Sequence, residues 1–216
     1  MDTMNQPKVT VIIVTYNAEG MKSIFKQCLD SSLNLKYNNY EVIVVNNGST
    51  DKIREILEDY EKDLKVIDLK QNVGFANANN IAYERSKSEF VLLLNSDAIP
   101  EQDSLNELIK NSRNERIVAV GGIQVDYNKN KIISLGGLCD IYGNWMIPKD
   151  KVNINEVRES YYTYIHASFL LVRRKSISIT LLPKEFFYVY GRHRTLLQNM
   201  ELRILFETIS YCCLLT

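Results

Sequence analysis

The sequence has few cysteines and no cysteine motif. The four cysteines among the 216 residues, Cys28, Cys139, Cys212 and Cys213, form no C-x-x-C pair and have no histidine cluster beside them. This spacing argues against a zinc site and against a disulfide framework. We expect the two isolated ones, Cys28 and Cys139, to be ordinary small buried residues.

The sequence also lacks an excess of charge of one sign and a long hydrophobic run. The 26 basic and 26 acidic residues give a formal net charge of zero, so no overall field draws the chain to nucleic acid or to an anionic membrane. No stretch approaches the roughly 20 apolar residues that span a bilayer. Residues 1–8 are polar and lack a signal-peptide core. We therefore expect a cytoplasmic protein.

The sequence does have a regular alternation of strand and helix patterns. Hydrophobic residues make up 45% of the chain, which is enough for the core of one sizeable domain. The alternation predicts an α/β fold with a mainly parallel, Rossmann-like sheet and right-handed crossovers. The predicted strands are Val9–Thr15, Glu41–Val45, Lys65–Leu69, Phe90–Leu94 and Ile117–Gly121. The predicted helices are Met21–Leu33, Asp51–Tyr60 (with Ser49 or Thr50 near its cap), Asn77–Ser86 and Asp103–Asn111.

Polar residues follow four of the predicted strands. Ligands of parallel sheets bind beyond the carboxyl ends of the strands, so these residues are the candidates for a binding site. Hydrophobic periodicity alone does not place polar groups at four strand ends. The candidates are Thr15, Tyr16 and Asn17, residues 46–51, residues 71–74, and Asn95, Ser96 and Asp97.

Asp97 is the most informative single candidate, because it follows the buried strand V-L-L-L-N. Mg²⁺ and Mn²⁺ prefer oxygen ligands and are usually held by one or two carboxylates plus substrate phosphates. Such an ion would neutralise the charge that develops on a diphosphate leaving group. The alternative interpretation is an aspartate that caps a following helix.

The polar residues after the second and third strands also have two interpretations each. Asn46, Asn47 and Asp51 could bind the edge of a nucleobase, or they could serve a turn and a helix N-terminus. In the segment N-V-G-F-A-N-A-N-N, Gly74 would let the backbone approach a ligand. The alternative there is a capped helix start with solvated asparagines, which Asn79 and Asn80 fit less well.

The second half of the chain has a different pattern. Residues 124–138 predict a hairpin with a turn near Asn128–Asn130, and Ser168–Val172 predict an apolar strand. His166 is more typical of a structural residue than of a catalyst. Three tyrosines could line an acceptor groove or simply pack: Tyr161, Tyr162 and Tyr164. Arg173 and Arg174 are typical of a solvated strand end, with a phosphate contact as the alternative.

Six segments, in order, resemble the family 2 glycosyltransferases, which have the GT-A fold. They are V-I-I-V-T-Y-N, V-V-N-N-G-S-T-D, N-V-G-F-A-N-A-N-N, L-L-L-N-S-D-A-I-P, H-A-S-F-L-L-V-R-R and E-F-F-Y-V-Y, and they cover roughly residues 8–190. The third is most similar to the rhamnosyltransferase-type branch. The resemblance implies a nucleotide-sugar-binding subdomain in residues 1–123 and a smaller acceptor-side β region in residues 124–190.

The resemblance also implies roles for single residues. Asn46 stands where the family usually has a base-binding aspartate, and Asn95-Ser96-Asp97 represents the metal-binding D-x-D, so Asp97 would be the ligand of Mg²⁺ or Mn²⁺. Asparagine at both positions leaves fewer carboxylates near the diphosphate, which implies weaker metal binding. The other implied donor-site residues are Thr15, Tyr16, Asn17, Asp51, Asn72, Gly74, Asn79 and Asn95.

The implied activity is transfer of a sugar, with inversion, from a nucleotide-diphosphate sugar to a glycan or lipid-linked acceptor, as in polysaccharide biosynthesis. Lipid-linked acceptors would bring the protein to the inner face of the membrane as a peripheral protein. Two alternatives stay open. One is a non-catalytic remnant that only binds a nucleotide sugar. The other is a nucleotidyltransferase, although no Gly-rich phosphate loop with a nearby lysine follows the first strand.

The segment after Tyr190 departs from the family pattern. The family shows Glu-Asp there, whose aspartate is the general base that deprotonates the acceptor hydroxyl. This chain has Gly191, Arg192, His193 and Arg194 instead, so the expected base is absent and no catalytic residue is assigned. Nothing in the sequence positions His193 as a substitute, and the apolar end of the chain has no evident packing partner. We therefore expect weak stability and little transfer.

A shift of reading frame at Gly191 would explain this departure. The codons AGA-CAT-AGA-ACT, permitted for residues 192–195, read one base out of register give Asp-Ile-Glu and then Leu. Met200 followed by Glu201 requires ATG-G, which gives Trp in that frame. The hidden frame can thus read E-D-I-E-L, then, after two further residues, Lys or Arg, then I-W-N-L-G-Y, the continuation that the family shows. We hypothesise that residues 191–216 are an out-of-frame tail.

We predict that the coding DNA contains an open shifted frame from the Gly191 codon. The shifted frame must contain a tryptophan codon at Met200-Glu201, and this argues against a match that arises only from the free choice of codons. Sequencing the gene around the Gly191 codon checks this. A shifted frame without Glu-Asp followed by a Trp-containing helix would rule the hypothesis out.

Overall fold

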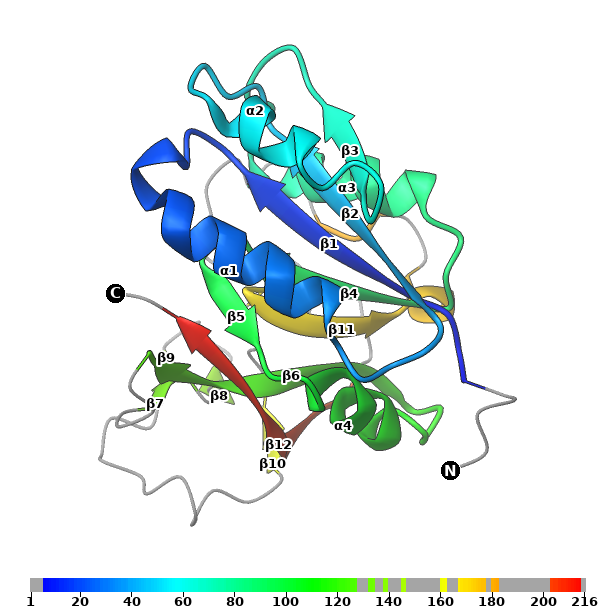
Figure 1. Cartoon of the computed structure of the whole chain (residues 1–216). Helices are drawn as coiled ribbons and strands as arrows, with labels where there is room; N and C mark the ends of the chain where they lie inside the picture. Colours follow the sequence, from blue (N-terminus) through cyan, green and yellow to red (C-terminus); the bar gives the residue numbers. More distant parts are fainter. Residues whose placement is uncertain are drawn as a thin grey trace.

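The computed structural model describes residues 6–127, 132–134, 138–139, 145–146, 160–162, 167–177, 180–182 and 203–214 (Figure 1). The described helices are α1 (Lys22–Leu33), α2 (Ile53–Glu58), α3 (Phe75–Arg85) and α4 (Ser104–Asn111), with 3₁₀ turns at Glu19–Met21 and Arg174–Ser176. The described strands are β1 (Val9–Thr15), β2 (Tyr40–Asn46), β3 (Lys65–Asp68), β4 (Phe90–Asn95), β5 (Ala98–Pro100), β6 (Ile117–Asp126), β7 (Ile132–Ser134), β8 (Leu138–Cys139), β9 (Trp145–Met146), β10 (Ser160–Tyr162), β11 (Phe169–Arg173) and β12 (Arg203–Leu214).

One mixed sheet organises these elements, and its strand order is β10-β12-β6-β11-β4-β1-β2-β3. The four strands β3, β2, β1 and β4 are parallel. β11 is antiparallel to both of its neighbours, β4 and β6. β5 pairs with β12 and β7 pairs with β6, while β8 and β9 form a separate ribbon. The α/β class and the parallel core expected from the sequence are confirmed.

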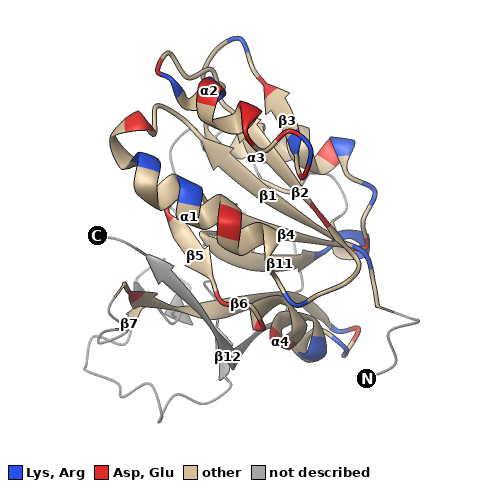
Figure 2. Cartoon of the chain, in the orientation of Figure 1, with Lys and Arg blue, Asp and Glu red and all other residues tan. Residues whose placement is uncertain are grey.

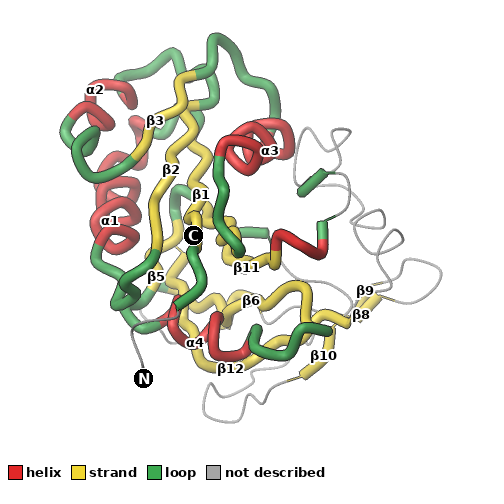
Figure 3. Tube along the Cα trace, turned by 90° about the vertical axis from the view of Figure 1, so that its right-hand side faces the viewer, coloured by secondary structure: helices red, strands yellow, loops and turns green. Residues whose placement is uncertain are grey.

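The helices cover both faces of the parallel strands, as Figure 3 shows, with α1 and α2 on one side and α3 on the other. Side chains alternate between two cores along each strand, as the two-residue strand period requires. In β4, Leu92 joins the core under α1 and α2, whereas Leu93 joins the core under α3. The fully buried runs of β1 and β4 carry no charged residue, as Figure 2 shows. This explains why they read in the sequence as strands covered on both faces.

The sequence-based expectation of a sheet that continues in parallel from Phe90–Leu94 to Ile117–Gly121 is wrong in one respect. β6 points the same way as β4, but antiparallel β11 lies between them. β6 also extends to Asp126 and so runs through the expected boundary between residues 123 and 124. That boundary stays a prediction.

The second half is partly as expected. β6 and β7 form the predicted hairpin, with its turn at residues 128–130 outside the described residues. The expectation that the apolar end of the chain has no partner is wrong, because β12 pairs with β6 and with β5. The frameshift itself stays a hypothesis. Also outside the described residues are Tyr164, His166, residues 183–202 and the side chains of Tyr161 and Tyr162.

The arginine pair at the end of β11 binds backbone carbonyls, so neither a solvated strand end nor a phosphate contact describes it. The Arg173 Nε donates to the Ile117 carbonyl (3.3 Å), and its guanidinium lies 4.6 Å from the centre of the Phe90 ring. The Arg174 Nε donates to the Ser88 carbonyl (2.7 Å). Arg173 pairs with the first residue of β4, at the end of the sheet opposite the strand ends that carry the candidate site.

None of the helices in the described part of the chain is long and apolar enough to cross a membrane.

Asn80 ties α3 to a segment far away in sequence. Its Nδ2 donates to the Leu182 carbonyl (2.7 Å), and its Oδ1 accepts from the Leu182 N–H (2.9 Å). Its neighbour Asn79 donates to the Phe75 carbonyl one turn back (2.9 Å). Both asparagines are buried, so solvated asparagines are not the explanation for this motif. Asn80 instead satisfies the buried backbone N–H and carbonyl of Leu182.

We expect Asn80→Ala to lower the free energy of unfolding by about 1–3 kcal/mol, because it leaves the buried N–H of Leu182 without a partner and leaves the Leu182 carbonyl with the Thr180 Oγ1 (3.2 Å) as its remaining donor. Urea unfolding followed by circular dichroism measures this. Asn79→Ala is the matched control, and it should cost less because alanine favours a helix. Equal losses in the two variants would contradict the assignment.

Candidate functional site

The carboxyl ends of the parallel strands bring the predicted residues to one edge. The last residue of β1, Thr15, pairs in register with Asn46 of β2, and Asn46 pairs with Asp68 of β3. On the other side of β1, Val14 pairs with Asn95 of β4. The Asn47 N–H donates to the Thr15 carbonyl (2.9 Å). Four strand ends therefore meet where the sequence placed a binding edge.

Asn17 and Asp51 join the loop after β1 to the loop after β2. The Asn17 Oδ1 accepts from the Thr50 N–H (2.9 Å), and the Asn17 N–H donates to the Ser49 Oγ (3.1 Å). The Asp51 Oδ2 accepts from the Glu19 N–H (2.7 Å), and its Oδ1 accepts from the Ile53 N–H (3.2 Å). Asn17 has a φ of 48°, a conformation that asparagine tolerates better than most residues.

Ser49 and Thr50 lie near the start of α2, as expected, but neither of them caps it. The N-cap of α2 is Lys52, which makes no side-chain capping bond, and the N–H of Ile53 is satisfied by Asp51. Ser49 and Thr50 bond to Asn17 across the loops instead. Asp51 therefore does serve the helix start, as one interpretation proposed, while it also binds the loop after β1.

Asn47 joins the loop after β2 to the loop after β3. Its Oδ1 accepts from the Val73 N–H (3.0 Å), and its Nδ2 donates to the Asn72 Oδ1 (3.0 Å). The Asn72 Oδ1 also accepts from the Gly74 N–H (2.9 Å). A Cβ on Gly48, whose φ is +71°, would lie 2.3 Å from the Gln71 carbonyl carbon. Only glycine fits where the two loops meet this closely.

The Asp97 carboxylate has an oxygen that nothing in the described protein binds. Its Oδ1 is buried and has no hydrogen-bond partner. Burial raises the pKa of the Asp97 carboxyl above its ordinary value, against a smaller lowering by the hydrogen bonds of its own backbone and of Asn95. The helix-cap alternative is wrong, because strand β5 follows directly and α4 begins at Ser104 with Asp103 as its N-cap.

These properties fit a divalent cation. A buried carboxylate oxygen without a donor is costly, and a hard cation that is also bound to phosphates would offset that cost. The described residues contain no group of three His, Cys, Asp or Glu that could hold a metal by themselves. A site with one carboxylate, completed by the phosphates of a ligand, agrees with both observations. Thr15 Oγ1, also buried without a partner, ends the neighbouring strand.

Of the other residues singled out in the sequence, Tyr16 lies at the edge, whereas Cys28 and Asn79 lie in the helices beside it. Tyr16 is about half exposed and directly follows β1, so it borders the edge. Cys28 is buried as expected, and its Sγ contacts the Asn95 carbonyl from α1 (3.5 Å); burial raises the pKa of its thiol to about 12. Asn79 bonds within α3, and no described hydrogen bond joins it to the strand ends. Its donor-site role stays a prediction.

Sequence reasoning missed Asp68 and Arg54. Asp68 ends β3 and accepts from the Asn46 Nδ2 (2.9 Å), and the Arg54 Nε lies 3.0 Å from its Oδ2. The one available signal was the position of Asp68 inside the predicted strand Lys65–Leu69, next to its carboxyl end.

Comparison with known proteins now decides the family. The model of "Glycosyl transferase family 2" matches residues 10–179. The chain belongs to that family. A glycosyltransferase of Haemophilus influenzae whose function is uncharacterised is 29% identical over 83% of this chain and 68% of its own length. A teichoic acid poly(glycerol phosphate) polymerase of Staphylococcus epidermidis is 27% identical over 93% of this chain, which spans only 31% of that relative.

Solved structures show the same fold. The structure of Staphylococcus aureus TarS 1–349 with UDP has a TM-score of 0.65 at 20% identity, covering 94% of this chain and 60% of that one. GalNAc-T7 with UDP, GalNAc and Mn²⁺ has a TM-score of 0.72 at 15% identity, covering 99% of this chain and 44% of that one. The GT-A fold that the sequence motifs implied is therefore confirmed.

We expect Asp97→Asn to raise the melting temperature of the metal-free protein at pH 7. Because the native pKa of Asp97 lies above the ordinary value of 3.8, the folded state binds its proton more tightly than the unfolded state does. Ionised Asp97 therefore lowers the stability of the folded state at pH values above its native pKa. This cost decreases as the pH falls from the native pKa towards the ordinary value. Calorimetry from pH 7 to pH 3 measures the difference. Asp103→Asn, an exposed carboxylate paired with Lys36, is the matched control, and a gain of the same size there would contradict the assignment.

Proposed function

We propose that this chain binds a nucleotide-diphosphate sugar at the strand-end edge and belongs to an enzyme that transfers the sugar, with inversion, to a glycan or lipid-linked acceptor. The observation that carries the proposal is the buried, unpartnered Oδ1 of Asp97 at the end of β4, in a chain of this family. The UDP-bound TarS structure supports a donor of this class through its fold.

A divalent cation, Mg²⁺ or Mn²⁺, completes the proposed site. Bound to Asp97, it would neutralise charge on the departing diphosphate. Mn²⁺ in the structures of GalNAc-T7 and of a Pyrobaculum calidifontis mannosyltransferase, whose TM-score is 0.56 at 23% identity over 81% of this chain and 46% of that one, supports the choice of a divalent ion. Because Asp97 is the single carboxylate proposed for this site and has Asn95 beside it, we expect the affinity for the cation to depend strongly on the phosphates of the bound donor.

The residues of this chain position the donor. The joined loops, held by Asn17, Asn47 and Asp51, form a fixed rim, because their backbone N–H groups are already bonded across the loops. Thr15 ends β1 beside that rim, and its Oγ1 is buried without a hydrogen-bond partner. Tyr16 offers a half-exposed ring on which a planar base can stack. A preformed rim reduces the entropy lost when the ligand binds.

A second candidate function follows from residues 191–194. Without a carboxylate after Tyr190, the chain would hold the nucleotide sugar and leave the acceptor hydroxyl without its base. Loss of a general base typically costs about 10²–10⁴ in rate. We therefore expect this chain to bind the nucleotide sugar with little turnover. The alternative function is that of a non-catalytic remnant, which binds the nucleotide sugar and transfers nothing. Lipid-linked acceptors, typical of the family, would bring the protein to the inner face of a membrane.

Calorimetric titration with UDP-, dTDP- and GDP-sugars, with and without Mn²⁺, tests the proposal, with hydrolysis and transfer followed in parallel. We expect at least one donor to bind in a Mn²⁺-dependent manner, and Asp97→Asn to abolish the dependence on Mn²⁺ while Asp103→Asn preserves it. Transfer should rise by about 10²–10⁴ when the shifted frame with Glu-Asp replaces residues 191–216. Failure of every donor to bind would overturn both candidate functions.

A further inference from the structure

The ends of β2 and β3 carry a paired carboxamide and carboxylate. The Asn46 Nδ2 donates to the Asp68 Oδ1 (2.9 Å), and the Asn46 Oδ1 accepts from the Ser49 N–H (3.2 Å). Asn46 is only 6% exposed. Because both ends of its amide are bonded, the orientation of Asn46 is fixed, and little of it remains for a ligand.

Asp68 is the accessible member of the pair. Its side chain is 44% exposed, and its two oxygens hold one bond from Asn46 and one from Arg54. An ionised carboxylate has about four acceptor sites, so roughly half of its acceptor capacity still faces outward. Asp68 is therefore an oriented acceptor at the same edge as Thr15 and Asn46.

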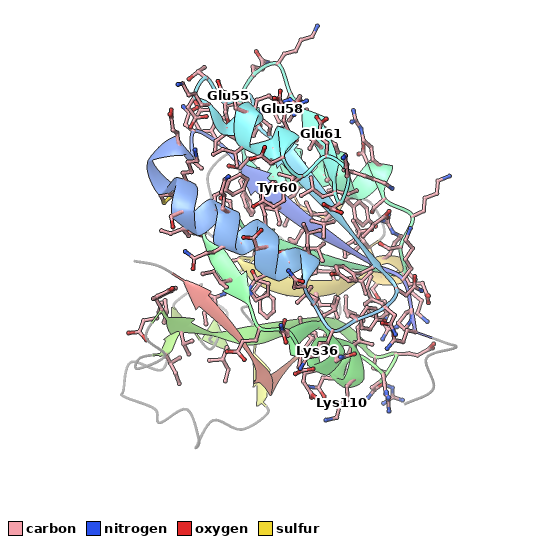
Figure 4. The ribbon with its side chains drawn as sticks, viewed as in Figure 1. Lys36, Glu55, Glu58, Tyr60, Glu61 and Lys110 are labelled. Atoms are coloured by element: carbon pink, nitrogen blue, oxygen red, sulfur yellow. The ribbon has the colours of Figure 1, made fainter. Side chains whose placement is uncertain are left out.

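Arg54 holds the outer oxygen of Asp68 in place. Its Nε lies 3.0 Å from the Asp68 Oδ2, and its Nη2 binds Glu61, which Figure 4 labels beside α2. A carboxylate fixed from two sides has lost its rotamer freedom before a ligand arrives, which favours specific over nonspecific contact.

The pairing also explains why asparagine suits position 46. Neighbouring strands lie about 4.8 Å apart, and like charges directly opposite each other are destabilising. An aspartate at 46 would face Asp68 in register. The structure thus places the one carboxylate of this pair on β3, at the exposed position.

We propose that Asp68 is a specificity-determining residue that accepts a hydrogen bond from the base of the bound nucleotide, an inference that rests on the proposed donor site. An ionised carboxylate accepts and cannot donate. It therefore selects a base with a ring N–H on its pairing edge, which uracil, thymine and guanine have. Adenine and cytosine present a bare ring nitrogen there, so two acceptors would face each other.

Titration of the full chain with UDP, dTDP, GDP, CDP and ADP in the presence of Mn²⁺ tests this. We expect at least one of UDP, dTDP and GDP to bind about 10-fold or more tightly than CDP and ADP, as for a hydrogen bond to a charged group. Asp68→Asn should remove most of this preference, because a carboxamide can also donate. Asp63→Asn, an exposed carboxylate that loses the same charge, is the matched control and should keep it.

The exchange variant Asn46→Asp/Asp68→Asn separates base contact from mere positioning of Asn46. It restores one carboxamide and one carboxylate, so its melting temperature should exceed that of Asn46→Asp alone. Its base preference should stay lost, because the carboxylate then occupies the buried position. Recovery of the preference in the exchange variant, or its survival in Asp68→Asn, would overturn the inference alone. If none of the five nucleotides binds, the donor site fails as well.

Discussion

Hydrogen bonds between loops at the carboxyl ends of β1, β2 and β3 are the constraint on which the candidate site depends. Parallel strands end together at this edge, and their turning backbones expose N–H groups that need partners. Asn17, Asn47 and Asp51 supply these partners across the loops. Short side chains with oxygen acceptors suit this task, which explains why asparagine and aspartate gather there. The same bonds fix the rim on which a donor would rest.

Asp97 departs from this pattern of satisfied groups, as does the buried Thr15 Oγ1 at the end of β1. The carboxylates of Asp51 and Asp68 are bonded by their neighbours, whereas the Oδ1 of Asp97 is buried without a partner. A group that breaks the general rule of satisfied buried polar atoms is a marker of function when its surroundings are otherwise consistent. The fold therefore tolerates a local instability at the position where a cation would relieve it.

The sequence predicted the elements that local pattern determines. β1 was located to the residue, because a β-branched run buried on both faces has few other interpretations. The three-residue strand β5 was missed, since it is defined only by its pairing with β12. The role of Asn80 depends on Leu182, which is 102 positions away, and no local signal carries such a contact. The strand end Asp68 resembled any solvated acidic residue until its bonds to Asn46 and Arg54 were visible.

The interposed position of β11 governs the order in which the chain can acquire its structure during synthesis. β1, β2, β3 and β4 find their partners within the first 95 residues. β6 has been made by residue 126, yet the strand that joins it to β4 ends only at Arg173. An emerging chain would thus hold a folded nucleotide-side half beside an apolar strand whose place in the sheet is still open. Chaperone binding and aggregation during translation would concentrate in that interval, because β6, paired then only with β7, exposes an apolar strand edge, and such edges favour both.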